Sequence, residues 1–308
     1  MDLISKISSF KQSTQLEAIK IMPFIYPFQY RLEILNKFNR DYRQKQLNLL
    51  QQSLLEMEHP QITNEFIISR KNIYEHSFQY FLEGKFNPFI RWKITFVNEF
   101  DQKEDGSKIF YKKKLVDAGG LYREYIYKLS EKAFSEKNKM FIESSTGFLM
   151  PNPDSHKMST MHLSIFEFLG FITGKAILDD INIWPNFSNF FLNNILEIEN
   201  SFNELKNYDA DLFKNLVYLK DYEGDCEKDL GLDFTISENK EGKNIVTELI
   251  ENGKNINVNN SNKLLYIKKV AQYKLYFQIK IQCDAFKKGI LSVFDQDGLK
   301  IFTAVNFF

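Results

Sequence analysis

Apolar residues recur at helical spacing over much of the chain and alternate strictly with polar residues at only a few places. The clearest helix surrounds Leu212, Leu216 and Leu219, which are three or four residues apart and so share one face. From Ile90 to Phe100 apolar and polar residues alternate, which is typical of a strand with one buried face. The pattern therefore predicts an α+β fold that is mainly helical.

The remaining elements are predicted from the same two periodicities and from the turn residues between them. Leu230 and Leu232 are expected to lead into a strand, and Glu251-Asn252-Gly253 is expected to join two strands as a hairpin. Helices are predicted over residues 28–55 (one helix or a pair), 73–82, 121–129, 161–178, 187–196 and 262–286 (broken at most once), and strands over 66–68, 140–150 (a strand or a hairpin), 233–236, 246–249 and 256–258.

Composition places the chain among soluble globular proteins. Of its 308 residues, 44% are hydrophobic and 26% are charged, and 40 basic residues balance 40 acidic ones. Because there is no net charge, no electrostatic field favours nucleic acid or an anionic membrane as a partner. The most apolar stretch, 161–178, contains His162, Glu167 and Lys175, so we expect a buried helix and no membrane span.

The two cysteines, Cys226 and Cys283, form no CxxC motif. Disulfide or zinc frameworks need closer or more numerous cysteines, so a reducing compartment is expected: the cytoplasm, with the nucleus as the alternative. The four histidines show no metal-ligand spacing. We therefore expect no metal and no cofactor.

Two glycine motifs invite a nucleotide interpretation. In GFITGKA, residues 170–176, the glycines are too close together for a P-loop and Ala176 replaces the hydroxyl that would reach magnesium. Close helix packing is the favoured explanation. The glycine pair after Asp117 could hold a phosphate, but it matches no nucleotide fingerprint and is interpreted as a strand-to-helix turn.

Several segments, in sequence order, resemble the N-lobe of HECT-type E3 ubiquitin ligases. They are VDAGGLYREYIYKLSEKAF, MPNP, FEFLGFITGKAI, LKDYEGDCEKDLGLDF, ELIENGKNINVNNSN and QCDAFKKGI. FIISR and PFIYPFQYRLEI resemble the segments that lead into that lobe, so the resemblance covers nearly the whole chain from about Pro23.

The resemblance implies a large helical subdomain and a small subdomain with short strands that binds a ubiquitin-conjugating E2 enzyme. It also implies a catalytic C-lobe, reached through a hinge, and the C-lobe is expected to be missing from this chain. The implied divisions are an N-terminal helical lead-in (1–22), the large subdomain (23–198), the small E2-binding subdomain (199–274), a return helix (275–294) and a truncated approach to the hinge (295–308).

The family's reaction passes ubiquitin from the E2 to a cysteine thioester and then to a substrate lysine. Cys226 lies between Asp225 and Glu227, which disfavour a thiolate, and Cys283 lies within a predicted helix. We therefore assign no catalytic residue: the chain is an enzyme by family, a ubiquitin transferase, but would supply only the E2-docking half. The alternatives are a stand-alone protein that sequesters E2 enzymes and a helical scaffold with no role in ubiquitin transfer.

The implied partners are a ubiquitin-charged E2 and ubiquitin. By position, the residues that would line the E2 groove are Leu212, Leu216, Tyr222, Leu230, Leu232 and Tyr266. The competing interpretation is that the leucine stripe is ordinary core, because an apolar helical face is usually buried within its own domain.

Overall fold

The computed structural model describes residues 27–55, 64–97, 120–183, 185–240, 242–294 and 299. The expected lead-in at 1–22, the turn at Asp117 and, apart from Leu299, the expected hinge approach at 295–308 lie outside these residues. The chain forms two compact units. The first consists of Met1–Phe141, Ser155–Pro185 and Asp284–Phe308, and the second of Ile142–Asp154 and Asn186–Cys283.

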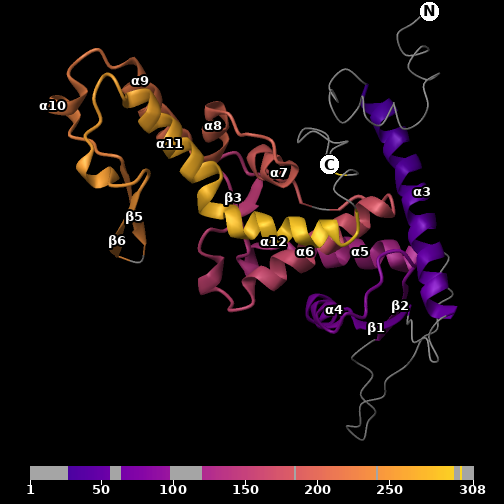
Figure 1. Cartoon of the computed structure of the whole chain (residues 1–308). Coiled ribbons are helices and arrows are strands. Elements are labelled where there is room, and N and C mark those ends of the chain that lie inside the picture. Colours follow the sequence, from indigo (N-terminus) through magenta and orange to yellow (C-terminus); the bar gives the residue numbers. More distant parts are fainter. Residues whose placement is uncertain are drawn as a thin grey trace, which may run out of the picture. The chain divides into compact units, whose positions relative to one another are not determined.

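The first unit is helical with one small sheet (Figure 1). Strands β1 and β2 pair in parallel, from Glu65 opposite Lys93 to Ser69 opposite Val97. Its elements are α3 (Phe28–Leu55), β1 (Glu65–Ser69), α4 (Ile73–Leu82), β2 (Lys93–Val97), α5 (Gly120–Ala133), η2 (Glu136–Asn138), η3 (Ser155–Lys157), α6 (His162–Leu178) and the C-terminal part of α12 (Lys280–Leu291).

Aromatic side chains fill the core of this unit. Trp92 is fully buried, stacks on Phe86 with 4.3 Å between ring centroids, and lies 5.9 Å from Phe171 of α6. Its indole Nε1 donates a hydrogen bond to the carbonyl of Asn87 at 2.7 Å. The one polar atom of this large side chain is thereby satisfied, and the loop before β2 is fixed to the core.

Lys175 is a buried cation on α6. Its ammonium donates to the carbonyls of Pro88 (2.6 Å) and Ile90 (3.2 Å) and pairs with Asp179 at 2.9 Å, so three oxygens match its three hydrogens. Burial lowers the pKa of Lys175 to about 8, although the Asp179 carboxylate partly offsets the effect. In the sequence, Lys175 argued against a membrane span. In the fold, its hydrogen bonds attach the loop before β2 to α6.

Glycines let α6 and α12 approach closely, as the spacing of GFITGKA predicts (Figure 1). A Cβ on Gly170 would lie 1.9 Å from the carbonyl oxygen of Phe286, and one on Gly289 would lie 1.9 Å from the carbonyl oxygen of Glu167. Gly174 is less confined, since its nearest neighbour is the Val293 side chain at 3.2 Å. The packing interpretation of these glycines is confirmed.

The described part of the second unit contains short helices and two two-stranded sheets, β3–β4 and β5–β6. Figure 1 shows α9 and α11 adjacent to each other, consistent with their packing contacts. Its elements are β3 (Phe141–Glu143, from Ile142 on), β4 (Leu149–Pro151), α7 (Asn189–Leu196), η4 (Phe202–Glu204), α8 (Leu205–Tyr208), α9 (Ala210–Asp221), α10 (Cys226–Leu230), β5 (Thr235–Lys240), β6 (Lys243–Glu248), η5 (Gly253–Asn255), α11 (Lys263–Leu275), η6 (Phe277–Ile279) and the start of α12.

The predicted α+β, mainly helical class is confirmed, but the predicted strand pairing of the second unit is wrong. β5 pairs antiparallel with β6, and Gly242 between them has a positive φ of 78°. Residues 256–258 form no strand, only an isolated bridge between Asn257 and Asp233. Asn252, with a φ of 55°, begins a 3₁₀ turn instead of a hairpin.

The segment expected to lead into a strand does so, since β5 begins at Thr235, but the alternation did not predict the short helix that Leu230 ends. The Asp225 side chain caps that helix, α10, at the Lys228 amide. The helical region predicted over 262–286, with at most one break, is confirmed: it is interrupted once, at Tyr276, where the backbone leaves helical geometry. The small subdomain predicted at 199–274 lies within the second unit, while its boundaries stay a prediction.

Candidate functional site

Helix α9 positions the first two of the predicted docking residues. The Asp209 carboxylate caps its N-terminus by accepting from the amides of Asp211 (3.1 Å) and Leu212 (2.9 Å). Leu216 is 5% exposed and therefore faces the core, whereas Leu212 is half-buried. One helical stripe thus serves both the core and a partly exposed surface.

Tyr222 follows α9 and is held by its neighbours. Its hydroxyl donates to Asp229 Oδ2 at 2.8 Å, which, with a smaller contribution from burial, raises the pKa of Tyr222 to about 12. Its carbonyl accepts from the Lys263 ammonium at 2.7 Å. A Cβ on Gly224 would lie 2.7 Å from the Tyr222 hydroxyl, so this turn favours glycine. The half-buried Tyr222 ring is therefore presented in a defined position.

The turn after Tyr222 is fastened to the segment before α11. Asn260 accepts from the Cys226 amide at 3.0 Å and donates to the Gly224 carbonyl at 2.9 Å. Asp225 pairs with Lys228 at 3.0 Å, and the side-chain and backbone hydrogen bonds from Lys228 lower the pKa of Asp225. These bonds hold the start of α10, the short helix that Leu230 ends.

The last two predicted residues are Leu232, which follows α10, and Tyr266, which lies on α11. The Leu232 carbonyl accepts from the Val258 amide at 2.8 Å, and the Leu232 side chain is half-buried like that of Leu230. Tyr266 on α11 is only 9% exposed and meets Phe234 edge to face at 5.6 Å, and burial raises its pKa. Tyr266 is thus mostly a core residue.

All six predicted residues lie in the second unit, on α9, α10, α11 and the segments that connect them, with unequal exposure. Four are half-buried, and Leu216 and Tyr266 are nearly covered. Sequence reasoning missed Tyr218, which is 62% exposed with its ring 5.6 Å from that of Tyr222. The four-residue spacing of these two tyrosines was the available signal. We name the six predicted residues together with Tyr218 the docking surface; its role in docking stays a prediction.

Both cysteines are covered. Cys226 is 1% exposed and Cys283 is 3% exposed, and neither forms a disulfide. Among the described residues, no group of three or more acidic, histidine or cysteine side chains could hold a metal ion. In the same residues no helix combines the length and apolar character that crossing a membrane requires.

The family model that matches the chain is the HECT-domain (ubiquitin-transferase), and the match covers residues 127–307. The match spans more than half of the chain, including the whole docking surface. The chain belongs to the HECT-domain family.

Relatives of the chain have names that agree with this assignment. A probable E3 ubiquitin protein ligase, C167.07c of Schizosaccharomyces pombe, is 30% identical over 98% of this chain and 28% of its own length. The E3 ubiquitin-protein ligase UPL6 of Arabidopsis thaliana is 30% identical over 91% of this chain and 26% of its own length. HUL5 of Saccharomyces cerevisiae, also an E3 ubiquitin-protein ligase, is 28% identical over 98% and 33%. The chain spans about a quarter to a third of the length of these relatives.

Proposed function

We propose that this chain is the part of a HECT-type E3 ubiquitin ligase that recruits a ubiquitin-charged E2 enzyme. The observation that carries the proposal is the family match over residues 127–307, which includes every residue of the docking surface. The named relatives, each an E3 ubiquitin ligase, support it. The overall reaction would be transfer of ubiquitin from one thioester to another and then to a substrate lysine.

The division of labour follows from the cysteines. A thioester nucleophile must be an accessible thiolate, whereas Cys226 and Cys283 are both buried. We infer that this chain contributes docking and that neither cysteine receives ubiquitin. The proposed compartment is the cytoplasm, with the nucleus as the alternative, and the two unpaired cysteines are compatible with either.

The docking surface suits a small, transient interface. Leu212, Leu230 and Leu232 offer half-buried apolar contacts, and Tyr222 adds a ring that its bond to Asp229 holds in place. Because the ring is ordered before binding, little side-chain entropy is lost when a partner loop packs on it. Aromatic anchors of this kind dominate the affinity of many interfaces.

Replacing Tyr222 by alanine is expected to weaken E2 binding by about 1–3 kcal/mol, which corresponds to roughly 5- to 150-fold in Kd. Tyr222→Phe should cause a smaller loss, because it keeps the ring and removes only the bond to Asp229. Titration calorimetry with the E2 enzyme, either carrying ubiquitin or free of it, measures the loss of affinity in both variants.

Phe277→Ala is the matched control, because Phe277 is 58% exposed in the same unit and lies outside the docking surface. It should leave E2 affinity unchanged. Wild-type affinity in a folded Tyr222→Ala protein, shown by an unaltered circular dichroism spectrum, would contradict the proposed surface.

A further inference from the structure

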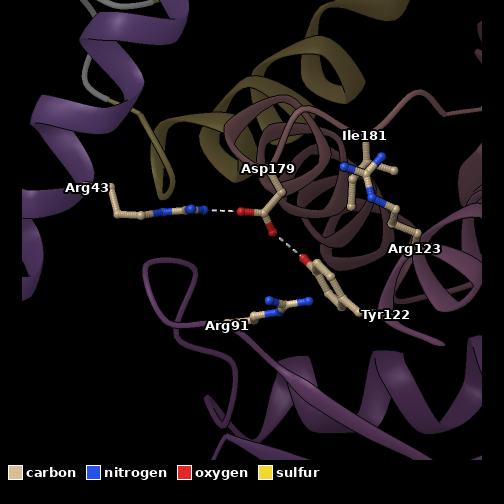
Figure 2. Close-up of a pocket in the computed structure, with 6 residues that line it drawn as sticks. All are labelled: Arg43, Arg91, Tyr122, Arg123, Asp179 and Ile181. Atoms are coloured by element: carbon tan, nitrogen blue, oxygen red, sulfur yellow. Dashed lines mark hydrogen bonds and ion pairs between the residues drawn. The ribbon is translucent and has the colours of Figure 1, made fainter. Parts of the chain in front are cut away.

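A second candidate site lies in the first unit, on residues outside the docking surface. It is a pocket of about 230 Å³ whose lining is unusually rich in arginine. Its lining residues come from four separate parts of the unit (Figure 2): Arg43 of α3, Arg91 before β2, Tyr122 and Arg123 of α5, and Asp179 and Ile181 after α6.

The single carboxylate that lines the pocket, that of Asp179, already has cationic partners. Asp179 pairs with Arg43 and accepts the hydroxyl of Tyr122, as Figure 2 shows, and it also pairs with the buried Lys175 at 2.9 Å. The side chain of Asp179 is only 9% exposed. Asp179 therefore holds Arg43 in place and has little capacity left to neutralise further positive charge.

The remaining arginines have no partner of this kind. Among the described residues, Arg91 and Arg123 form no hydrogen bond or ion pair, and both are exposed. Arg91 extends beneath the contact between Asp179 and Tyr122, and Arg123 lies beyond Tyr122 near Ile181 (Figure 2). The surroundings of the pocket thus carry a surplus of positive charge.

One donor at the site is both buried and unsatisfied. The Nε of Arg43 has no hydrogen-bond partner, although the guanidinium of the same residue binds Asp179. A buried donor without an acceptor is unfavourable by about 1–3 kcal/mol, and such an atom marks a place where an acceptor is expected. An anion in the pocket would supply acceptor oxygens to Arg91 and Arg123 and to the guanidinium atoms of Arg43 that line it.

The dimensions limit the ligand. At about 230 Å³ the pocket is smaller than the roughly 300–1,000 Å³ of a drug-sized ligand site. A phosphoryl group with part of its hydration shell fits this space. Guanidinium groups also match phosphate oxygens in a bidentate geometry, which lysine does not provide.

We propose that this pocket binds a phosphoryl group, with Arg91 and Arg123 as its principal ligands and Arg43 as an oriented third donor. The ligand would bridge α3, the segment before β2 and α5, which are far apart in the sequence. Binding should therefore stabilise the first unit. The source of the phosphoryl group is either a free phosphate compound or a phosphorylated side chain.

The test uses the complete chain and two probes at constant ionic strength: inorganic pyrophosphate and a short peptide containing one phosphoserine. Isothermal titration and the thermal unfolding midpoint are measured for the wild type and for the double variant Arg91→Gln/Arg123→Gln. These residues are exposed and unpaired, so the double variant should fold. Binding of at least one probe should raise the midpoint, and the double variant should weaken that binding at least tenfold.

Lys128→Gln/Lys137→Gln removes the same charge from exposed positions of the same unit that do not line the pocket. It should change the affinity less than twofold. Tighter binding of pyrophosphate would identify a free phosphate compound as the source, and tighter binding of the peptide would identify a phosphorylated side chain. Absence of binding by both probes at millimolar concentration, or an equal loss in the two double variants, would overturn the proposal.

Discussion

Gly170→Ala is expected to lower the free energy of unfolding of the first unit by about 3 kcal/mol or more, the upper part of the range for overpacked cores. The added methyl would lie 1.9 Å from the carbonyl oxygen of Phe286, which is backbone and cannot rotate away. Alanine normally favours a helix over glycine by about 0.5–1 kcal/mol, so the expected sign is opposite to helix propensity. Gly289→Ala, facing the carbonyl of Glu167 at the same distance, should behave alike.

Gly174→Ala provides the internal comparison. Its methyl would meet the Val293 side chain at 3.2 Å, which a small movement can relieve, so the change should stay within about 1 kcal/mol. Hydrogen exchange of the amides in α6 and α12 reports the loss locally. Equal protection in the Gly170→Ala and Gly174→Ala proteins would show that the close approach of the two helices is not required.

Lys175→Met should be the second large effect, with an expected loss of about 3–5 kcal/mol, as for a broken buried ion pair. Methionine fills a similar volume but leaves the carbonyls of Pro88 and Ile90 without their donor. The loop before β2 would lose its attachment to α6. Chemical denaturation measures the loss, and Lys137→Met, at an exposed position, is the control.

The difference in stability between the wild type and Lys175→Met should change with pH in a defined direction. In the folded protein burial holds the pKa of Lys175 near 8, whereas the usual value is 10.5, so between these values the unfolded chain binds more protons. Stability contributed by Lys175 should therefore rise as the pH increases from about 8 to 10.5. Comparing unfolding of the wild type and Lys175→Met across this range isolates the effect, and a difference that shrinks with pH would contradict it.

Sequence patterns predicted the long elements well because each of these has several periodic residues. Helix α4 begins and ends where the pattern placed it, at Ile73 and Leu82. The five-residue helix α10 is too short to show a period, and its position depends on the Asp225 cap and on the bond from the Cys226 amide to Asn260, 34 residues later. Such contacts leave no local signal in the sequence.

The candidate sites show the same limit. Helical spacing grouped Leu212 and Leu216 on one face, but it could not tell that Leu216 faces the core while Tyr218 is the more exposed neighbour. No sequence pattern predicted the arginine-lined pocket proposed to bind a phosphoryl group. Arg43, Arg91 and Arg123 are far apart in the chain, and only the fold collects them around Asp179.

The first unit consists of three separate stretches of the chain, so its parts are synthesised at different times. Gly289 emerges from the ribosome roughly 120 residues after Gly170, which at 5–20 residues per second is a delay of about 6–24 s. During that interval the glycine-lined face of α6 has been synthesised but α12 has not. We expect a chaperone to bind the apolar face of α6 in the nascent chain until α12 has been synthesised and can cover it.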